Sequence, residues 1–157
     1  MTVDTNQSTE TLYEQDYNLW LETIVKKLRL REFSGIDLDN LIEELESMGR
    51  SDKRALKSLL TRLFEHLLKI AYWETEREYN QNKWKVEIRT FRQQIADLLN
   101  DSPSLNNHLN SIFEECYHRA RKNIIDLTGL SSQFFPDTPI SNIEEILDEN
   151  WLPEFDK

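Results

Sequence analysis

Four polar side chains lie where the helical pattern of this sequence calls for apolar ones. They are Asp16, Glu44, His66 and Arg92, and each falls within or beside the apolar arc of its own predicted helix. A carboxylate and an imidazole on facing helices can bind a metal ion or act as an acid–base pair, and the cores of helical bundles commonly hold such sites. The sequence therefore contains one candidate polar cluster, with Glu44 and His66 as its candidate metal ligands.

The same cluster also has a structural interpretation. Arg92 would pair with Glu44 or Asp16, and His66 would donate to a carboxylate or a tyrosine hydroxyl, because a buried charge without a partner is strongly destabilising. A catalytic metal site needs more ligands than Glu44 and His66 supply, and the positive charge of Arg92 would repel a cation. We therefore favour the structural network. It predicts that Glu44 and Arg92 are energetically coupled and that His66 shares their environment.

No other motif indicates a catalytic centre or a cofactor. Glu115 and His118 have the Glu-x-x-His spacing of di-iron bundles, but the motif occurs once and His118 is predicted to face solvent. Cys116 falls inside an apolar stripe and is expected to be an inert core residue. The sequence has no Gly-rich phosphate loop, nucleophile elbow or paired-histidine metal motif. We therefore predict no bound cofactor.

The composition indicates a small, acidic, helical protein. With 157 residues, 3 Gly and 4 Pro, the chain is long enough for one core and offers little material for hairpins. The net charge of −10 comes from the ends, because residues 1–25 contain 5 acidic and no basic residues, and residues 126–157 contain 8 acidic residues and 1 lysine. Without a basic face, nucleic-acid binding is disfavoured. The lack of a long apolar run or a signal sequence predicts a cytoplasmic protein that does not engage a membrane.

The segment 51–73 has the clearest helical pattern and is the predicted centre of the fold. Its apolar residues recur at helical spacing and cover one broad face. They are Leu56, Leu59, Leu60, Leu63, Phe64, Leu67, Ile70 and Ala71. Further helices are predicted over 12–31, 37–48, 84–100, 103–127 and a short stretch after residue 141. Gly49 is expected to end the second helix, Gly35 to end the first, and residues 74–82 to form a polar connection.

These elements predict an all-α fold, an irregular bundle of five to six helices around the long central helix at 51–73. Residues 1–10 are polar and without periodicity, so they are predicted to be a disordered lead. Residues 11–157 are predicted to form a single helical domain. Its acidic C-terminal segment is expected to pack over the bundle, because Phe134, Phe135, Trp151 and Leu152 are apolar.

An ordered series of short motifs runs through these predicted helices. It comprises Tyr13-x-x-Asp16-Tyr17-x-x-Trp20, the segment 41–56, His66-Leu67-Leu68-Lys69, Trp84 with Arg92, Asp101-Ser102-Pro103, Thr128-Gly129, Phe135-Pro136 and Trp151-Leu152-Pro153. In this order, the set resembles the bacterial family called "domain of unknown function 29" over about residues 12–154. The chain departs from the family pattern at Lys83 and at residues 137–139. The resemblance implies an all-helical cytoplasmic protein without an established activity.

Two classes of function are compatible with the sequence. The favoured one is a non-enzymatic protein-interaction module, since catalytic motifs are missing and the ends are acidic. An inhibitor or antitoxin that covers a basic partner with these ends is one version, and self-association into a homo-oligomer is another. The alternative is a metal-assisted hydrolase or related enzyme built on Glu44 and His66. The sequence identifies neither the partner nor a substrate.

Overall fold

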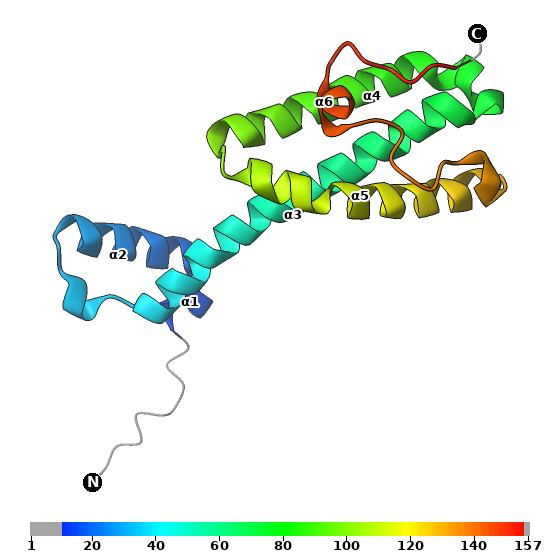
Figure 1. Ribbon diagram of the computed structural model, residues 1–157. Helices are drawn as coiled ribbons and strands as arrows, with labels where there is room; N and C mark the ends of the chain where they lie inside the picture. Colours follow the sequence, from blue (N-terminus) through cyan, green and yellow to red (C-terminus); the bar gives the residue numbers. More distant parts are fainter. Residues whose placement is uncertain (1–10, 156–157) are drawn as a thin grey trace. The chain divides into compact units, whose positions relative to one another are not determined.

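Every regular element in the part of the chain that the structure describes is a helix. The structure is a computed structural model and describes residues 11–155. Within these residues there is no strand. The α-helices are α1 (Leu12–Gln15), α2 (Tyr17–Arg29), α3 (Leu38–Tyr72), α4 (Glu74–Asp101), α5 (Leu105–Thr128) and α6 (Ile143–Leu147), joined by the short 3-10 helices η1 (Phe33–Gly35) and η2 (Ser132–Phe134) (Figure 1). The predicted all-α bundle around a long α3 is confirmed. The predicted disordered lead, residues 1–10, lies outside the described residues.

The contacts within the chain group into two compact units. The N-terminal unit comprises residues 1–49 and the C-terminal unit residues 50–157. Helix α3 begins in the first unit and ends in the second. That residues 11–157 form a single domain stays a prediction.

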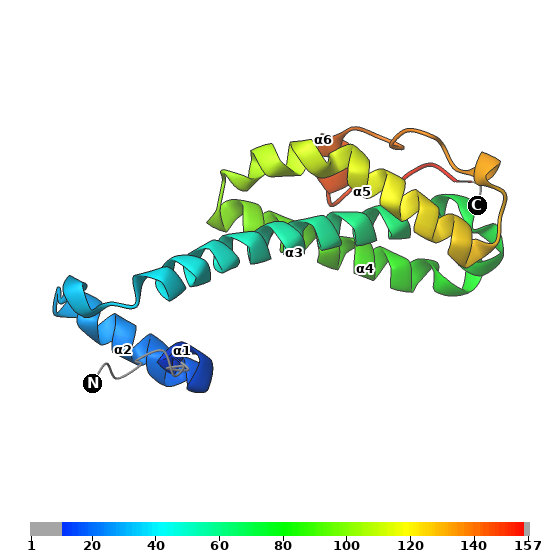
Figure 2. The ribbon, with the colours of Figure 1, turned by 90° about the horizontal axis from the view of Figure 1, so that it is seen from below.

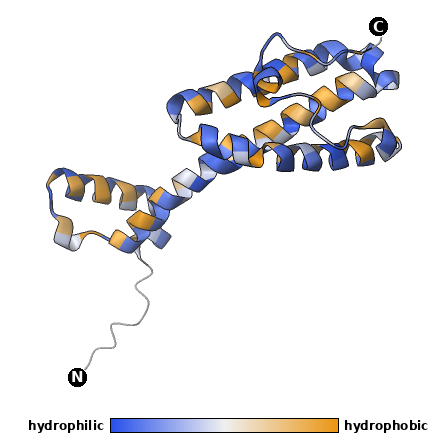
Figure 3. Cartoon of the chain, viewed as in Figure 1, coloured by the Kyte–Doolittle hydropathy of each residue, from blue (hydrophilic) through white to orange (hydrophobic). Residues whose placement is uncertain are grey.

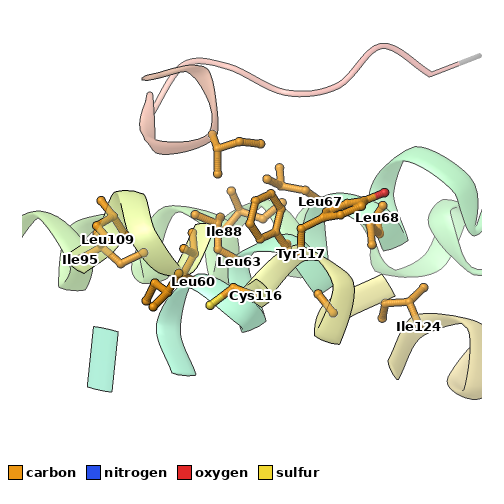
Figure 4. Packing of buried hydrophobic residues seen from close by; sticks show 14 of the residues in the cluster. Leu60, Leu63, Leu67, Leu68, Ile88, Ile95, Leu109, Cys116, Tyr117 and Ile124 are labelled. Atoms are coloured by element: carbon orange, nitrogen blue, oxygen red, sulfur yellow. The ribbon is translucent and has the colours of Figure 1, made fainter. Parts of the chain in front are cut away.

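The C-terminal unit has a continuous apolar core. In both views α4 and α5 lie alongside the second half of α3 (Figures 1 and 2). Leu63, Phe64 and Leu67 of α3 are completely buried, and the ring of Phe64 meets those of Phe113 and Tyr117 edge-on. Figure 4 shows how side chains from the three helices meet at this core. Burying one large aliphatic or aromatic side chain contributes about 1.5–3 kcal/mol, so this cluster is the main source of stability for the unit.

The irregular C-terminal segment, residues 130–155, packs on the same core. Phe135 and Ile146 are buried within it, and Trp151 and Leu152 pack against it. These contacts agree with the expectation that the segment covers the bundle. Phe134 differs, because it is exposed.

Side chains of α5 hold this segment by its main chain. The hydroxyl of Tyr117 donates to the carbonyl of Pro136 at 2.5 Å, and Arg121 donates to the carbonyls of Ser132 and Phe135. These bonds satisfy main-chain acceptors in a segment that has few helical bonds of its own.

The prediction that Gly49 separates two helices is wrong. Helix α3 is continuous through Gly49. A glycine inside a helix costs only about 1 kcal/mol relative to alanine, so strong helix formers on both sides carry the helix through it. The predicted central helix, 51–73, is therefore the second part of a 35-residue helix.

The prediction of a polar connection over 74–82 is also wrong, since α4 begins at Glu74. Most of this stretch is exposed, and an exposed helical turn has no apolar periodicity to reveal it. Its buried exception is Arg77, whose Nε and Nη2 donate to the carbonyls of Ile70 and Ala71 at 2.6 and 2.8 Å. The side chain thus satisfies carbonyls at the C-terminal end of α3, which lack helical partners.

The predicted helix over 12–31 is interrupted at Asp16. This residue ends α1 and caps α2, since its Oδ1 accepts from the main-chain N–H of Leu19 at 3.0 Å. The predicted stop at Gly35 is wrong as well. Helix α2 ends at Arg29, and Arg31 takes the left-handed conformation with φ of 57°.

Large apolar side chains are mostly exposed in the N-terminal unit. Trp20 and Ile24 are its only buried residues among those described, and the indole N–H of Trp20 donates to Asp37 at 3.2 Å. The helices of this unit nevertheless carry many apolar residues (Figure 3).

Candidate functional site

Asp16 does not belong to an inward polar cluster. Its side chain is exposed and its carboxylate caps α2. A capping carboxylate accepts from main-chain N–H groups that would otherwise lack partners. Because a capping residue lies next to the first turn of its helix, Asp16 falls beside the apolar arc that the sequence pattern predicts.

Glu44 is held by two tyrosine hydroxyls within the N-terminal unit. Tyr13 donates to Oε2 at 2.6 Å and Tyr17 donates to Oε1. These hydrogen bonds stabilise the ionised carboxylate and lower the pKa of Glu44. The hydrogen bond to Glu44, together with desolvation, raises the pKa of Tyr13 to about 12. The hydrogen bond of Tyr17 to Glu44, again with desolvation, raises the pKa of Tyr17. Glu44 therefore links α3 to the aromatic residues of α1 and α2.

His66 is paired with Glu87 of α4. Its Nε2 lies 2.7 Å from Oε2 of Glu87, and its Nδ1 lies 2.8 Å from the main-chain carbonyl of Arg62. A main-chain carbonyl can only accept, so Nδ1 donates to Arg62. The prediction that His66 pairs with a carboxylate is confirmed, but the carboxylate is Glu87.

Arg92 is buried in the C-terminal unit, with only 3 % of its surface exposed. Its Nε donates to the carbonyl of Ile146 at 2.8 Å, while its Nη2 is buried and has no hydrogen-bond partner among residues 11–155. Burial lowers the pKa of Arg92 to about 10, although the negative charges of Asp148 and Glu149 act in the opposite direction. Arg92 thus contacts the C-terminal segment through a main-chain carbonyl.

The four candidate residues therefore have four different sets of partners. The predicted pairing of Arg92 with Glu44 or Asp16 is corrected, because Glu44 binds tyrosines of its own unit and Arg92 binds Ile146. Glu44 belongs to the N-terminal unit and His66 to the C-terminal unit. Among residues 11–155, no group of three or more His, Cys, Asp or Glu side chains is placed to hold a metal ion.

The other two sequence-based expectations for single side chains are confirmed. Cys116 is fully buried, and burial raises the pKa of its thiol. His118 is exposed.

The sequence analysis missed a set of exposed apolar side chains on the N-terminal unit. We call it the N-terminal apolar face and define it by the large apolar residues between 17 and 48 that are at least 40 % exposed. They are Tyr17, Leu19, Val25, Leu28, Leu30, Phe33, Leu38, Ile42, Leu45 and Met48. In the described part of the C-terminal unit, only Tyr79, Val86, Leu127 and Phe134 are comparably exposed. The amphipathic spacing of these residues was visible in the sequence, but it was interpreted as the pattern of buried core residues.

A shallow groove lies within this region on α2. It has a volume of about 470 Å³, and its lining surface is almost entirely apolar. Leu21, Val25 and Leu30 contribute apolar surface, and the stems of Glu22, Lys26 and Arg29 complete the lining. The groove is therefore apolar, with two positive charges and one negative charge at its margin. No helix in the part of the chain described here has the length and hydropathy to cross a bilayer.

Comparison with known proteins identifies the family. No significant match was found among curated proteins or solved structures. The family described as "Domain of unknown function DUF29" matches residues 12–152. The departures at Lys83 and at 137–139 lie inside this matched range. Because the match covers nearly the whole chain, the protein belongs to the DUF29 family.

Proposed function

We propose that this protein is a non-enzymatic protein-interaction module and that the N-terminal apolar face is its contact surface. The observation that carries the proposal is the concentration of exposed large apolar side chains between residues 17 and 48. Exposed patches of this kind on a soluble unit mark sites where another surface binds. The catalytic alternative lacks such support, since Glu44 and His66 have separate partners.

The small core of the N-terminal unit supports the same proposal. With Trp20 and Ile24 as its buried residues among those described, the unit buries little apolar surface of its own. Each square ångström of apolar surface removed from water contributes roughly 25 cal/mol. Covering the N-terminal apolar face with a partner would therefore stabilise the unit as well as form the complex.

The charges on α2 and α3 would be complementary between two copies of the chain, so a second copy is the proposed partner. The groove on α2 is bordered by Lys26, Arg29 and Glu22, so its margin carries a net positive charge. The first part of α3 has Leu38, Ile42 and Leu45 along one side, with Asp39, Glu43 and Glu46 on the same helix. In a two-fold pair, the acidic α3 of each copy would face the basic groove of the other, so both contacts would be complementary.

The test is self-association of the full chain. Analytical ultracentrifugation over a concentration series should give a dimer, and Leu45→Lys should weaken it at least about tenfold, as expected for a change at the centre of an apolar contact. The matched control is Leu127→Lys, because Leu45 and Leu127 are 59 % and 56 % exposed, both on helices, and Leu127 lies in the C-terminal unit. The control should leave the association constant unchanged.

Two results would separate self-association from binding of another protein. In the first result, the chain is monomeric and captures a stoichiometric partner from lysate, and capture is lost in Leu45→Lys but not in Leu127→Lys. This result would support the interaction surface and would show that another protein, not a second copy, binds to it. A chain that stays monomeric and captures no partner in a Leu45-dependent manner would overturn the proposal.

A further inference from the structure

The C-terminal unit contains a second groove, unrelated to the N-terminal apolar face. It lies between α4 and the C-terminal segment and has a volume of about 250 Å³. Lys85, Arg89 and Arg92 line it from α4, and Glu149 and Asn150 line it from the segment. A space of this size holds a small molecule or a single functional group rather than an extended chain.

Three cations face this groove from one side of α4. Lys85, Arg89 and Arg92 are spaced four and three residues apart, so they share one face of the helix. Neither Lys85 nor Arg89 makes a hydrogen bond or ion pair within the described residues. Positive charges thus converge on the groove without being neutralised by direct contacts.

Arg92 provides the strongest sign of a missing partner. It is almost fully buried, and its Nη2 has no hydrogen-bond partner among the described residues. A buried N–H without an acceptor is costly, and the cost is greater when the group is charged. Asp148 and Glu149 are near enough to act on Arg92 electrostatically, yet neither forms an ion pair with it within residues 11–155. The carbonyl of Ile146 engages Nε, so the orientation of the guanidinium is set while Nη2 is left over.

We propose that this groove binds a small phosphate-type oxyanion, held by Lys85, Arg89 and Arg92. The lining has three cations and one carboxylate, and Asp148 beside it adds a second negative charge. The excess of one to two positive charges matches a phosphoryl group at neutral pH. Arginine is suited to this role because its planar N–H groups fit phosphate oxygens. The Asn150 amide offers a further donor at the margin. This proposal does not depend on the interaction function.

The test uses the full chain with inorganic phosphate as the probe. Calorimetric titration with sodium phosphate should show saturable binding, whereas sodium chloride at the same ionic strength should show none. Arg89→Gln should weaken phosphate binding at least tenfold, since Arg89 is exposed and its replacement leaves the core intact. The matched control is Lys83→Gln, an exposed cation of α4 outside the groove lining, which should bind phosphate like the unmodified chain.

A second variant and a second probe sharpen the result. Arg92→Lys keeps the charge but loses the planar donors, and it should also weaken binding while circular dichroism confirms a helical fold. Methyl phosphate distinguishes the source: binding as tight as that of inorganic phosphate points to a phosphorylated small molecule, and weaker binding points to the free ion. The proposal is overturned if phosphate binds no better than chloride, or if Arg89→Gln and Lys83→Gln lose affinity equally.

Discussion

The two units of the chain contain similar amphipathic helices but bury them to different extents. In the C-terminal unit, α3, α4, α5 and the C-terminal segment enclose one continuous apolar cluster. In the N-terminal unit, α2 and the first part of α3 carry apolar stripes that are largely exposed. The sequence pattern is of the same kind in both. The difference lies in the number of surfaces available to cover each stripe, and this is why the same pattern yields a core in one unit and a candidate interface in the other.

The largest expected effect contrasts two leucines of the same helix. Leu63→Ala should lower the free energy of unfolding by about 2–5 kcal/mol, because Leu63 is completely buried and its truncation leaves a cavity. Leu45→Ala, at a 59 % exposed position, should change the stability of the monomer by less than about 0.5 kcal/mol. Urea denaturation at low protein concentration measures both. Similar losses for the two variants would mean that the Leu45 stripe is core after all.

A smaller effect is expected at the boundary between the units. Gly49→Ala should raise the free energy of unfolding by about 0.5–1 kcal/mol, because alanine favours the helix and an added Cβ would meet nothing within 4 Å. Gly129→Ala is the contrasting variant, since Gly129 has φ of 68° and ends α5. It should be destabilising. Thermal denaturation followed by circular dichroism tests the pair, and a destabilising Gly49→Ala would show that α3 is interrupted there.

The smallest effect concerns the polar contact of the N-terminal unit. Glu44→Gln should move the pKa of Tyr13 from about 12 back towards its ordinary value of 10, because the neutral amide no longer stabilises the protonated phenol. Ultraviolet absorbance during an alkaline titration reports this change, with Tyr13→Phe identifying the phenol.

The same contact gives a pH dependence whose sign follows from the lowered pKa of Glu44. Its stabilising contribution is present above the ordinary pKa of a glutamate and is lost as the pH falls through the lower folded value. In Glu44→Gln this loss should disappear. An unchanged acid limb of the stability profile would contradict the contact.

Helix formation was largely predictable, and the errors were local. The apolar stripe of 51–73 predicted the central helix, and Gly129 predicted the end of α5. Gly49 and residues 74–82 were misinterpreted because weak helix breakers and polar stretches carry little information when neighbouring turns favour a helix. Asp16 was misinterpreted because a capping residue falls beside the apolar arc of the helix that it begins.

The sequence by itself determined that the chain is helical, which residues form the apolar stripes, and which polar side chains lie at their margins. Only the tertiary structure decided the partners. His66 binds Glu87 from the next helix, Glu44 binds Tyr13, and Arg92 binds a main-chain carbonyl that no side-chain pattern reveals. The physical reason is that helical periodicity is a local property, set by 3.6 residues per turn. Pairing and exposure depend on which surfaces far apart in the sequence come together, so the exposed face between residues 17 and 48 was recognisable only in the folded chain.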